Sequence, residues 1–260
     1  MPTALITGAT DGLGRAVARD LAAQGWTILV HGRSRERAQE TLDEVPGGRA
    51  YIADLSSLAD VRRLADEVLA REERLHVLVN NAGIGSAEGE GRQESADGYE
   101  LTFAVNYLSH FLLTLRLLDL LKRSAPARIV NVASAGQMAI DFDDVQLERA
   151  WNGTRAYCQS KLAQILFTFD LADELRDRGV TATCLHPASY MPTKIVTAAR
   201  TPLSTLEEGV EATLALIRDH DGVTGAYFNG THEARADPQA YDADARRRLR
   251  ELSERLTGVS

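Results

Sequence analysis

The feature that most constrains the fold of this 260-residue chain is a regular alternation of short, apolar, β-type runs with longer, helix-type runs. Strands with near-continuous apolar runs are buried on both faces, and strands separated by helices are joined by parallel crossovers. The pattern therefore predicts one α/β domain over residues 1–260, built on a doubly wound, seven-stranded parallel sheet. The expected strands cover residues 4–7, 27–30, 49–53, 75–79, 128–132, 180–185 and 223–228. One expected helix follows the first strand. The other expected helices cover residues 34–44, 58–71, 97–123, 155–178 and 206–218.

Composition excludes several classes of protein. Hydrophobic residues make up 44% of the chain and charged residues 25%, which suits one globular core and is too apolar for disorder. The net charge of −8 repels phosphate backbones and anionic membranes, so the expected partners are small molecules or proteins and not nucleic acid. The two cysteines, Cys158 and Cys184, are too few for a disulfide framework. No histidines have metal-binding spacing, so no metal is expected.

Two further observations bear on location. The chain enters a structured motif by Thr7, which leaves no room for a signal peptide. The most apolar stretch, residues 101–121, carries Asn106, His110 and Asp119, and polar groups at interior positions of a span cost roughly a few kcal/mol each in lipid. A protein-buried helix is therefore expected there instead of a membrane span. The expected location is the reducing environment of the cytoplasm.

The first expected strand runs directly into a glycine-rich turn and then into a helix. Glycines let the backbone approach a pyrophosphate closely, and the free amides at a helix N-terminus favour its negative charge. The turn lies at the start of a strand–helix–strand unit, which indicates dinucleotide binding over a plain tight turn. The turn residues expected to contact the cofactor are Gly8, Thr10, Asp11, Gly12, Leu13 and Gly14.

The residues after the second expected strand bear on which dinucleotide is bound. NAD sites usually place an acidic residue there for the ribose 2′-hydroxyl, whereas this chain has Gly32 followed by Arg33. The Arg33 guanidinium suits a 2′-phosphate and favours NADP(H); the alternative is an exposed arginine that merely begins the next helix. Asp11 weakens the case for NADP(H). A basic residue inside the glycine-rich turn would favour NADP(H) further, and this chain has an acidic residue there.

Four motifs together resemble the short-chain dehydrogenase/reductase family. They are Thr7-Gly8-x-x-x-Gly12-x-Gly14, Asn80-Asn81-Ala82-Gly83, Ser134 after the fifth strand, and Tyr157-x-x-x-Lys161, in the family's order and spacing over almost the whole chain. The sequences around Tyr157 and at residues 225–228 are similar to the retinol-dehydrogenase-like and WW-domain-oxidoreductase-like branch. The resemblance implies a Rossmann-type fold and a nicotinamide cofactor.

The resemblance and side-chain chemistry assign catalytic roles to four residues, Asn106, Ser134, Tyr157 and Lys161. Tyr157 and Lys161 lie four residues apart on one helix face, where an ammonium can lower the pKa of a phenol and make it a general acid/base. Ser134 is expected to hold the substrate oxygen, and Lys161 to reach the nicotinamide ribose as well. In this family the position of Asn106 anchors a water between Lys161 and solvent; the alternative is a packing hydrogen bond.

Loops at the strand ends complete the expected cofactor site. Asp54 can accept from the adenine amine or instead cap the next helix, and the 80–83 turn lies near the adenosine. Where the family usually has Pro-Gly against the nicotinamide, this chain has Pro187-Ala188, followed by Thr193 as an amide or pyrophosphate ligand. Residues 188–205 resemble a substrate lid. The residues expected at the cofactor from these elements are Asp54, Leu55, Asn81, Ala82, Gly83, Tyr157, Lys161, Pro187 and Thr193, and those expected in the apolar wall of the lid are Tyr190, Met191, Ile195 and Val196.

The expected function is NADP(H)-dependent interconversion of a carbonyl and an alcohol on a small-molecule substrate. Two alternatives are an NAD(H)-dependent dehydrogenase of the same fold and a non-catalytic dinucleotide-sensing protein. A homo-oligomer is also expected, because family members commonly pair through the helices at 97–123 and 155–178. The rings expected to add apolar area to that face are Phe103, Phe111, Phe167 and Phe169.

Overall fold

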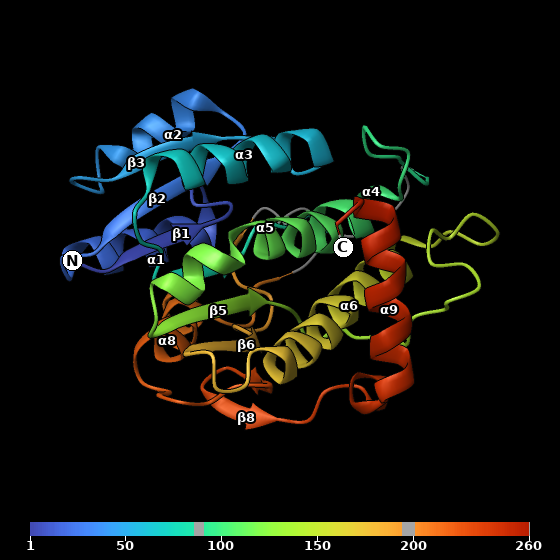
Figure 1. Cartoon of the computed structure of the whole chain (residues 1–260). Helices are drawn as coiled ribbons and strands as arrows, with labels where there is room; N and C mark the ends of the chain where they lie inside the picture. The colour runs from blue at the N-terminus through green and yellow to red at the C-terminus, as the bar shows by residue number, and fades with distance from the viewer. Residues whose placement is uncertain (86–90, 194–200, 260) are drawn as a thin grey trace.

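The computed structural model describes residues 1–85, 91–193 and 201–259 of the chain (Figure 1). The strands are β1 (Thr3–Ile6), β2 (Thr27–Gly32), β3 (Arg49–Ile52), β4 (Val77–Asn80), β5 (Ala127–Val132), β6 (Val180–His186), β7 (Ala226–Asn229) and β8 (His232–Ala234). The α-helices are α1 (Gly12–Ala23), α2 (Arg35–Leu42), α3 (Leu58–Arg71), α4 (Leu101–Phe103), α5 (Ser109–Arg123), α6 (Gly153–Glu174), α8 (Leu206–Arg218) and α9 (Ala243–Thr257). Two short helices are η1 (Ala104–Leu108), a π-helix between α4 and α5, and η2 (Pro238–Tyr241), a 3-10 helix.

The described strands form one sheet in the order β3-β2-β1-β4-β5-β6-β7-β8. The chain starts in the middle and builds outward in both directions with parallel neighbours, so the predicted doubly wound, Rossmann-type α/β fold is confirmed. The seven predicted parallel strands are confirmed as β1 to β7, and the sheet has one strand more than predicted. The eighth strand, β8, pairs antiparallel with β7 at the sheet edge. It is three residues long and largely exposed, so it has no apolar run that a sequence pattern could reveal.

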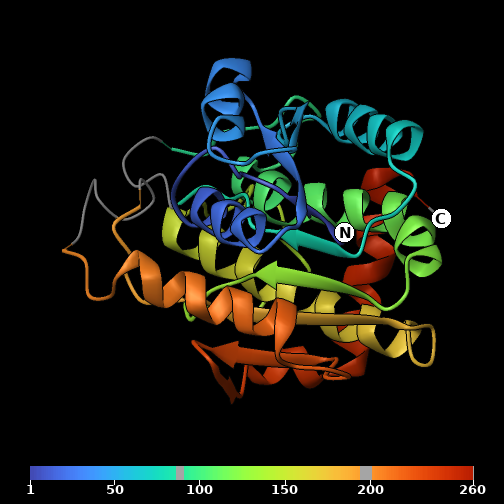
Figure 2. The ribbon, with the colours of Figure 1, turned by 90° about the vertical axis from the view of Figure 1, so that its left-hand side faces the viewer.

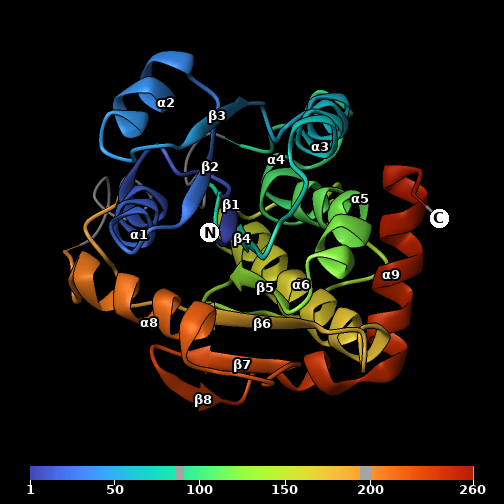
Figure 3. The ribbon, with the colours of Figure 1, turned by 60° about the vertical axis from the view of Figure 1, so that its left-hand side comes forward.

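Helices cover both faces of this sheet (Figure 3). α1, α2 and α8 lie over one face, and α3, α5 and α6 lie over the other. Each face has its own apolar cluster: Val17 and Ile217 belong to the first, and Leu64, Phe111 and Leu166 to the second. The strands between them are buried on both sides, as their continuous apolar sequences predicted.

The carboxyl ends of the parallel strands meet at one edge of the sheet. In Figure 2 the green arrow of β5 and the orange-red arrow of β7 end on the same side of the molecule. The loops that leave this edge carry the predicted site residues, from the glycine-rich turn after β1 to Ser134 after β5 and Pro187 after β6. Ligands of doubly wound sheets bind at this edge, so the topology brings the predicted site together.

Residues 101–123 form the stretch, within the described ranges, whose length and apolar composition would suffice to cross a membrane. Its most apolar window is 78% buried inside the protein, in agreement with the predicted buried helix. The helix begins at Leu101, four residues later than expected. Glu100 defines this start, because its carboxylate accepts a hydrogen bond from the Phe103 amide at 2.7 Å.

The C-terminal helix α9 packs against α6 on the α5 side of the sheet (Figure 1, red). Leu249 is 1% exposed, and the Tyr107 hydroxyl shares a 2.7 Å hydrogen bond with the Ser253 hydroxyl. Arg250 forms ion pairs with Asp170 and Glu174 of α6 at 3.0 and 2.9 Å. Apolar burial and ion pairs therefore both attach α9 to the rest of the chain.

This packing corrects one expectation about the surface. Phe103, Phe111, Phe167 and Phe169 are between 0% and 6% exposed, and the Arg250 guanidinium lies 5.8 Å from the Phe111 ring centroid. The four rings are thus core residues beneath the chain's own last helix. They offer no exposed apolar face for a second copy of the chain.

We predict that Leu249→Ala lowers the free energy of unfolding by about 2–5 kcal/mol, because it removes buried methyl groups from the α6–α9 contact. Urea denaturation would measure the change. Leu203→Ala is the matched control, since Leu203 is 71% exposed and its truncation should stay within about 0.5 kcal/mol of the parent protein. Equal stabilities of the two variants would contradict the packing of α9.

Candidate active site

The glycine-rich turn after β1 is folded tightly enough to exclude side chains. A Cβ on Gly14 would lie 2.5 Å from both the Gly8 carbonyl oxygen and the Asn81 side-chain nitrogen, and Gly8 has a φ of +66°. Asp11 caps α1, with its carboxylate accepting from the Gly12 amide at 2.9 Å. The first amides of an α-helix have no partner within the helix, so this turn and the α1 N-terminus form a cradle that fits a pyrophosphate.

The 80–83 turn after β4 holds this cradle in place. The Thr7 hydroxyl accepts hydrogen bonds from the Asn81 and Ala82 amides, both at 2.9 Å, and the Asn81 side chain donates to the Thr7 carbonyl at 2.8 Å. Asn80 donates to Asn131 on β5 at 2.8 Å and so ties the two central strands together. These contacts attach the turn both to the glycine-rich turn and to the two central strands.

His31 is a supporting residue that the sequence did not reveal. Its Nδ1 accepts from the Gly8 amide at 3.2 Å, and its Nε2 lies 3.2 Å from the Ala53 carbonyl oxygen. Because Nδ1 accepts, the ring proton lies on Nε2 and the imidazole is neutral. Burial lowers the pKa of His31 to about 4. No local pattern distinguishes such a histidine from any other one at the end of a strand.

Thr193 lies directly over the glycine-rich turn. Its methyl carbon would be 3.3 Å from a Cβ placed on Gly12, which puts it beside the α1 N-terminus. Pro187 is buried at the end of β6. Met191, expected in the substrate wall, is instead packed among core residues and contacts the Gly209 position of α8. Of the predicted lid at 188–205, residues 194–200 lie outside the described ranges, and with them Ile195 and Val196.

Arg33 and Arg37 together define the charge at the end of β2. Arg33 is exposed, and within the described residues its side chain makes no hydrogen bond or ion pair. Arg37, one helical turn further on, forms a 2.7 Å ion pair with Asp11 and donates to the Thr10 carbonyl at 3.2 Å. The sequence-based reasoning missed Arg37, although its four-residue spacing from Arg33 was the available signal.

Gly32 and the β3 loop shape the adenosine end of the cradle. A Cβ on Gly32 would lie 2.4 Å from the Thr10 methyl group, so only glycine fits between β2 and the turn. Asp54 accepts from the Ser56 amide at 2.9 Å, and Leu55 is buried. The alternative role of Asp54 as the cap of α3 is wrong, because Ser57 caps that helix by accepting from the Asp60 amide.

Ser134 and Tyr157 meet at the carboxyl end of β5. The Ser134 hydroxyl accepts from the Gly136 amide at 3.0 Å and lies near enough to the Tyr157 phenol to act on its pKa, which it lowers. A Cβ on Gly136 would lie 3.5 Å from the Ser134 hydroxyl and 3.7 Å from the Tyr157 ring, so the loop passes close over both. Burial raises the pKa of Tyr157, which is the opposite direction to the sequence-based expectation for this residue.

The C-terminal segment fastens the loop that carries Ser134. Gln239 accepts from the Ile140 amide at 2.7 Å and donates to the Ile140 carbonyl at 3.1 Å. Gln137 donates to the Ser134 carbonyl at 3.0 Å and accepts from the Asp237 amide at 2.7 Å. The contacts of Gln239 with Ile140 and of Asp237 with Gln137 join residues about one hundred positions apart, which no local sequence pattern could predict.

Lys161 is buried one helical turn after Tyr157 on α6, with its ammonium 5.8 Å from the centre of the Tyr157 ring. Its Nζ donates to the Val132 carbonyl and to the Gln164 side-chain oxygen, each at 2.9 Å. Burial lowers the pKa of Lys161 to about 7. The amine is therefore close to half charged near neutral pH.

Asn106 lies within the π-helical segment η1 and reaches toward the same place. Its side chain accepts from the Ile84 amide at 2.8 Å and donates to the Ser160 hydroxyl at 3.1 Å. A Cβ on Gly83 would lie 3.2 Å from the Asn106 side-chain oxygen and 3.6 Å from the Lys161 Nζ. All four predicted catalytic residues are thus gathered at the carboxyl edge of β4 and β5, and Gly83 keeps the space between two of them open.

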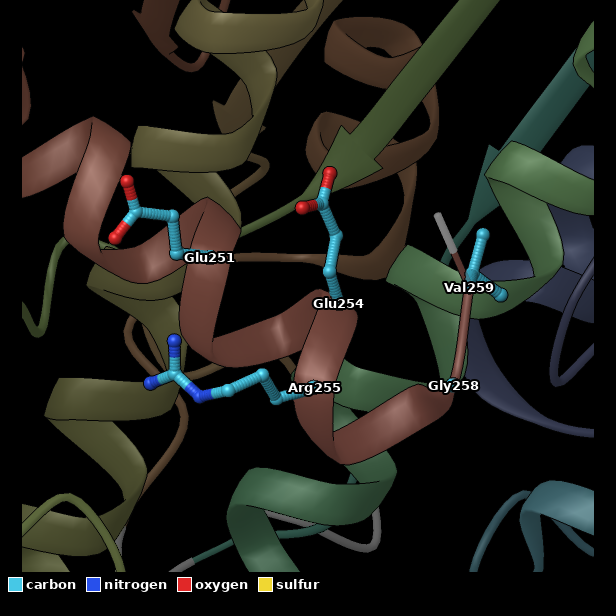
Figure 4. Close-up of a pocket in the computed structure, with 5 residues that line it drawn as sticks. All are labelled: Glu251, Glu254, Arg255, Gly258 and Val259. Carbon is cyan, nitrogen blue, oxygen red and sulfur yellow. The ribbon is translucent and has the colours of Figure 1, made fainter.

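Two surface hollows have different relations to this cluster. One, of about 340 Å³, is bordered by Pro187, Ser189 and His232 at the ends of β6 and β7, next to the predicted lid. The other, of about 490 Å³, lies at the end of α9 and contains none of the predicted site residues (Figure 4). Its lining residues are Glu251, Glu254, Arg255, Gly258 and Val259.

The site has a pyrophosphate cradle beside a serine–tyrosine–lysine cluster, at the carboxyl edge of a doubly wound sheet. This arrangement defines a class of protein, the nicotinamide-dependent oxidoreductases.

Among the described residues no group of three or more His, Cys, Asp or Glu side chains could hold a metal ion.

Comparisons with known proteins narrow this class. Residues 2–203 match the family model described as short chain dehydrogenase. Retinol dehydrogenase 13 from Mus musculus is 35% identical over 293 aligned residues, which cover 99% of this chain and 84% of that protein. The chain belongs to the short-chain dehydrogenase family, in its retinol-dehydrogenase-like branch, and is an oxidoreductase that interconverts carbonyl and alcohol groups with a nicotinamide dinucleotide.

Solved structures agree with this assignment. The crystal structure of an uncharacterised protein from Mycobacterium paratuberculosis has a TM-score of 0.83 at 29% identity, covering 99% of this chain and 94% of that one. The NADP active-site complex of Pseudomonas aeruginosa RhlG has a TM-score of 0.72 at 27% identity, covering 88% and 94% of the respective chains.

The buried histidine beneath the cradle gives a prediction for stability. His31 has a pKa of about 4 in the folded chain and an ordinary pKa near 6.5 when unfolded, so the unfolded state binds protons first. Its contribution is fully present above pH 6.5 and is lost as the pH falls toward 4. We expect His31→Asn to reduce the loss of unfolding free energy between pH 7 and pH 5 by about 2 kcal/mol, measured by urea denaturation. His232→Asn is the exposed control, and the same pH dependence in both variants would contradict the assignment.

Proposed function

We propose that this protein is an NADP(H)-dependent carbonyl reductase or alcohol dehydrogenase in which Tyr157 is the general acid/base. The observation that carries the proposal is the meeting of the Ser134 hydroxyl with the Tyr157 phenol, one helical turn from the buried Lys161 and beside the glycine-rich cradle. The substrate is a small molecule with a ketone, aldehyde or alcohol group. The proposed location is the cytoplasm, which fractionation of cells would test.

The proton steps follow from the positions of these side chains. When bound, the dinucleotide supplies or accepts the hydride at the carbonyl carbon. Ser134 donates a hydrogen bond to the substrate oxygen and holds it next to the Tyr157 hydroxyl. In the direction of reduction, Tyr157 gives its proton to that oxygen; in the direction of oxidation, the phenolate takes the proton back.

Lys161 tunes Tyr157 and holds the ribose. In the chain alone, burial raises the pKa of Tyr157 and lowers that of Lys161 to about 7, so both groups favour their neutral forms. Negative charge and ribose hydroxyls next to Lys161 would favour the ammonium. A charged amine 5.8 Å from the ring centre would then lower the pKa of Tyr157 toward the working range.

The preference for NADP(H) rests on the two arginines after β2. Asp11 places a carboxylate in the glycine-rich turn, but Arg37 pairs with it at 2.7 Å and offsets its charge. Arg33 is exposed beside this pair and presents a planar guanidinium suited to a 2′-phosphate.

We predict that Arg33→Ala weakens NADPH binding about 10- to 100-fold and leaves NADH binding nearly unchanged, because a charge-assisted contact contributes about 1.5–3 kcal/mol. Fluorescence titration of the two reduced cofactors would measure both affinities. Arg35→Ala is the matched control, since Arg35 is an exposed arginine two residues away. Equal weakening of both cofactors by Arg33→Ala would rule out the 2′-phosphate role and favour NAD(H).

We predict that Tyr157→Phe lowers the single-turnover rate of carbonyl reduction about 10²- to 10⁴-fold at saturating NADPH, since it removes a positioned general acid. Fold and NADPH affinity should be preserved. Tyr241→Phe controls for the loss of a phenol outside the site. Retinal and retinol belong in the substrate panel because of the relative's name. A near wild-type rate for Tyr157→Phe would contradict the mechanism, and an inactive wild type across the panel would favour a dinucleotide sensor.

A further inference from the structure

The side of Lys161 that faces the protein interior is occupied by a glutamine. Gln164 lies one turn after Lys161 on α6, is 1% exposed, and accepts from the Lys161 Nζ at 2.9 Å through its side-chain oxygen. The Val132 carbonyl at the end of β5 accepts from the same Nζ at 2.9 Å. Two of the three N–H groups of an ammonium are therefore used within the protein. The position that a Cβ on Gly83 would fill lies 3.6 Å from the Nζ and is left open for a third contact.

The orientation of the Gln164 amide is set by Lys161. An ammonium only donates, so a charged Lys161 requires the oxygen of the Gln164 amide to face it. The amide nitrogen then lies 3.2 Å from Nδ1 of His110 on α5. The Asn106 carbonyl oxygen, 3.0 Å from the same Nδ1, only accepts, so Nδ1 carries the ring proton and the Gln164 amide nitrogen lies beside it without a hydrogen bond. Nε2 of His110 lies 3.3 Å from the Thr7 hydroxyl. Gln164 thus packs beside His110, and His110 contacts the π-helical segment and the start of the glycine-rich turn.

The groups around Lys161 determine how much the hydrogen bond from Lys161 to Gln164 matters for the charge of the amine. The titratable groups that face it within the described residues are Tyr157 on its own helix and His110 on α5; the other neighbours on β5 and η1 are the neutral Val132 and Asn106. Burial raises the pKa of Tyr157 and lowers that of His110 to about 3, so neither carries a negative charge near pH 7. Burial alone accounts for the lowered pKa of Lys161, with no carboxylate in the described residues to oppose it. The neutral oxygens of Val132 and Gln164 are therefore the groups that stabilise the ammonium.

We propose that Gln164 is a positioning residue for Lys161, which favours the protonated form of the buried amine and directs its remaining N–H toward the open space at Gly83. This inference rests on the proposed role of Lys161 at the ribose. Gln164 acts through Lys161, because its own side chain is buried behind the amine and faces neither Ser134 nor the Tyr157 hydroxyl. Loss of the amide oxygen should therefore change when Lys161 is charged, and only through that the binding of the cofactor.

The chain is well suited to a direct test because it contains three lysines, Lys122, Lys161 and Lys194. Labelling lysine with ¹³C at the ε carbon gives three NMR signals, and Lys161→Arg identifies the one that belongs to Lys161. Titration from pH 5 to 11 then measures the pKa of Lys161 in the protein without cofactor or substrate. The readout is thus independent of whether the proposed reaction occurs.

We expect the wild-type Lys161 signal to titrate near pH 7. Gln164→Leu should lower this midpoint by about one unit, since a hydrogen bond to a charged donor is lost. Gln164→Glu should raise it, because a carboxylate replaces the neutral oxygen. Gln159→Leu is the matched control: Gln159 is an equally buried glutamine of α6 that contacts Asp141 and Val145 and not Lys161.

A second measurement connects the titration to binding. NADPH affinity of Gln164→Leu should match the wild type at pH 6 and fall about 10-fold below it at pH 8, following the shift in Lys161 charge. A Lys161 midpoint unchanged in both Gln164 variants would overturn the proposal, and Gln164→Glu alone decides it if Gln164→Leu does not fold. If the proposed function is wrong, Lys161→Arg and the wild type should bind NADPH equally poorly. The Lys161 midpoints measured by NMR would still differ among the Gln164 variants, so the two failures can be distinguished.

Discussion

The burial of the Lys161 amine is the constraint on which the arrangement of the site depends. A cation removed from water is unstable unless oxygen atoms replace its hydration, and here the replacements are the Val132 carbonyl and the Gln164 amide. This requires the carboxyl end of β5, helix α6 and the 80–83 turn to meet at one point. The doubly wound topology meets the requirement, because β4 and β5 are central neighbours and α6 packs over β6 and β5. The site and the middle of the fold are therefore held by the same contacts.

The two halves of the site are linked through the interior as well as at the surface. Thr7 at the end of β1 contacts the 80–83 turn through its hydroxyl, and the same hydroxyl lies 3.3 Å from His110. His110 contacts Gln164 and the Asn106 carbonyl, so one buried polar network extends from the pyrophosphate cradle to Lys161. Buried networks of this kind are stable only when their members are hydrogen-bonded, which fixes the relative positions of cradle and catalytic cluster before any ligand arrives.

The parts of this account that the sequence predicted are those encoded by neighbouring residues. The glycine-rich turn, the Tyr157–Lys161 spacing and the strand–helix alternation are local patterns, and the structure brings these residues together as expected. The parts it did not predict depend on contacts between distant segments. His31 under Gly8, Arg37 against Asp11 and the covering of Phe111 by α9 each require knowing which elements lie side by side. The direction of the Tyr157 pKa shift was mistaken for a related reason, since burial, which depends on the whole fold, raises that pKa and outweighs the lowering effect of Ser134 in the chain alone.

The buried, partly neutral Lys161 should become charged when NADPH binds. Isothermal titration calorimetry at pH 8, in two buffers of different ionisation enthalpy, measures this as protons taken up per cofactor bound. With a pKa of about 7 the free amine is mostly neutral at pH 8, so the account predicts uptake approaching about one proton as the pKa returns toward its ordinary value near 10. Lys161→Arg, whose side chain stays charged, should show almost none. Binding of NADPH by the wild type with no proton uptake at pH 8 would contradict the account.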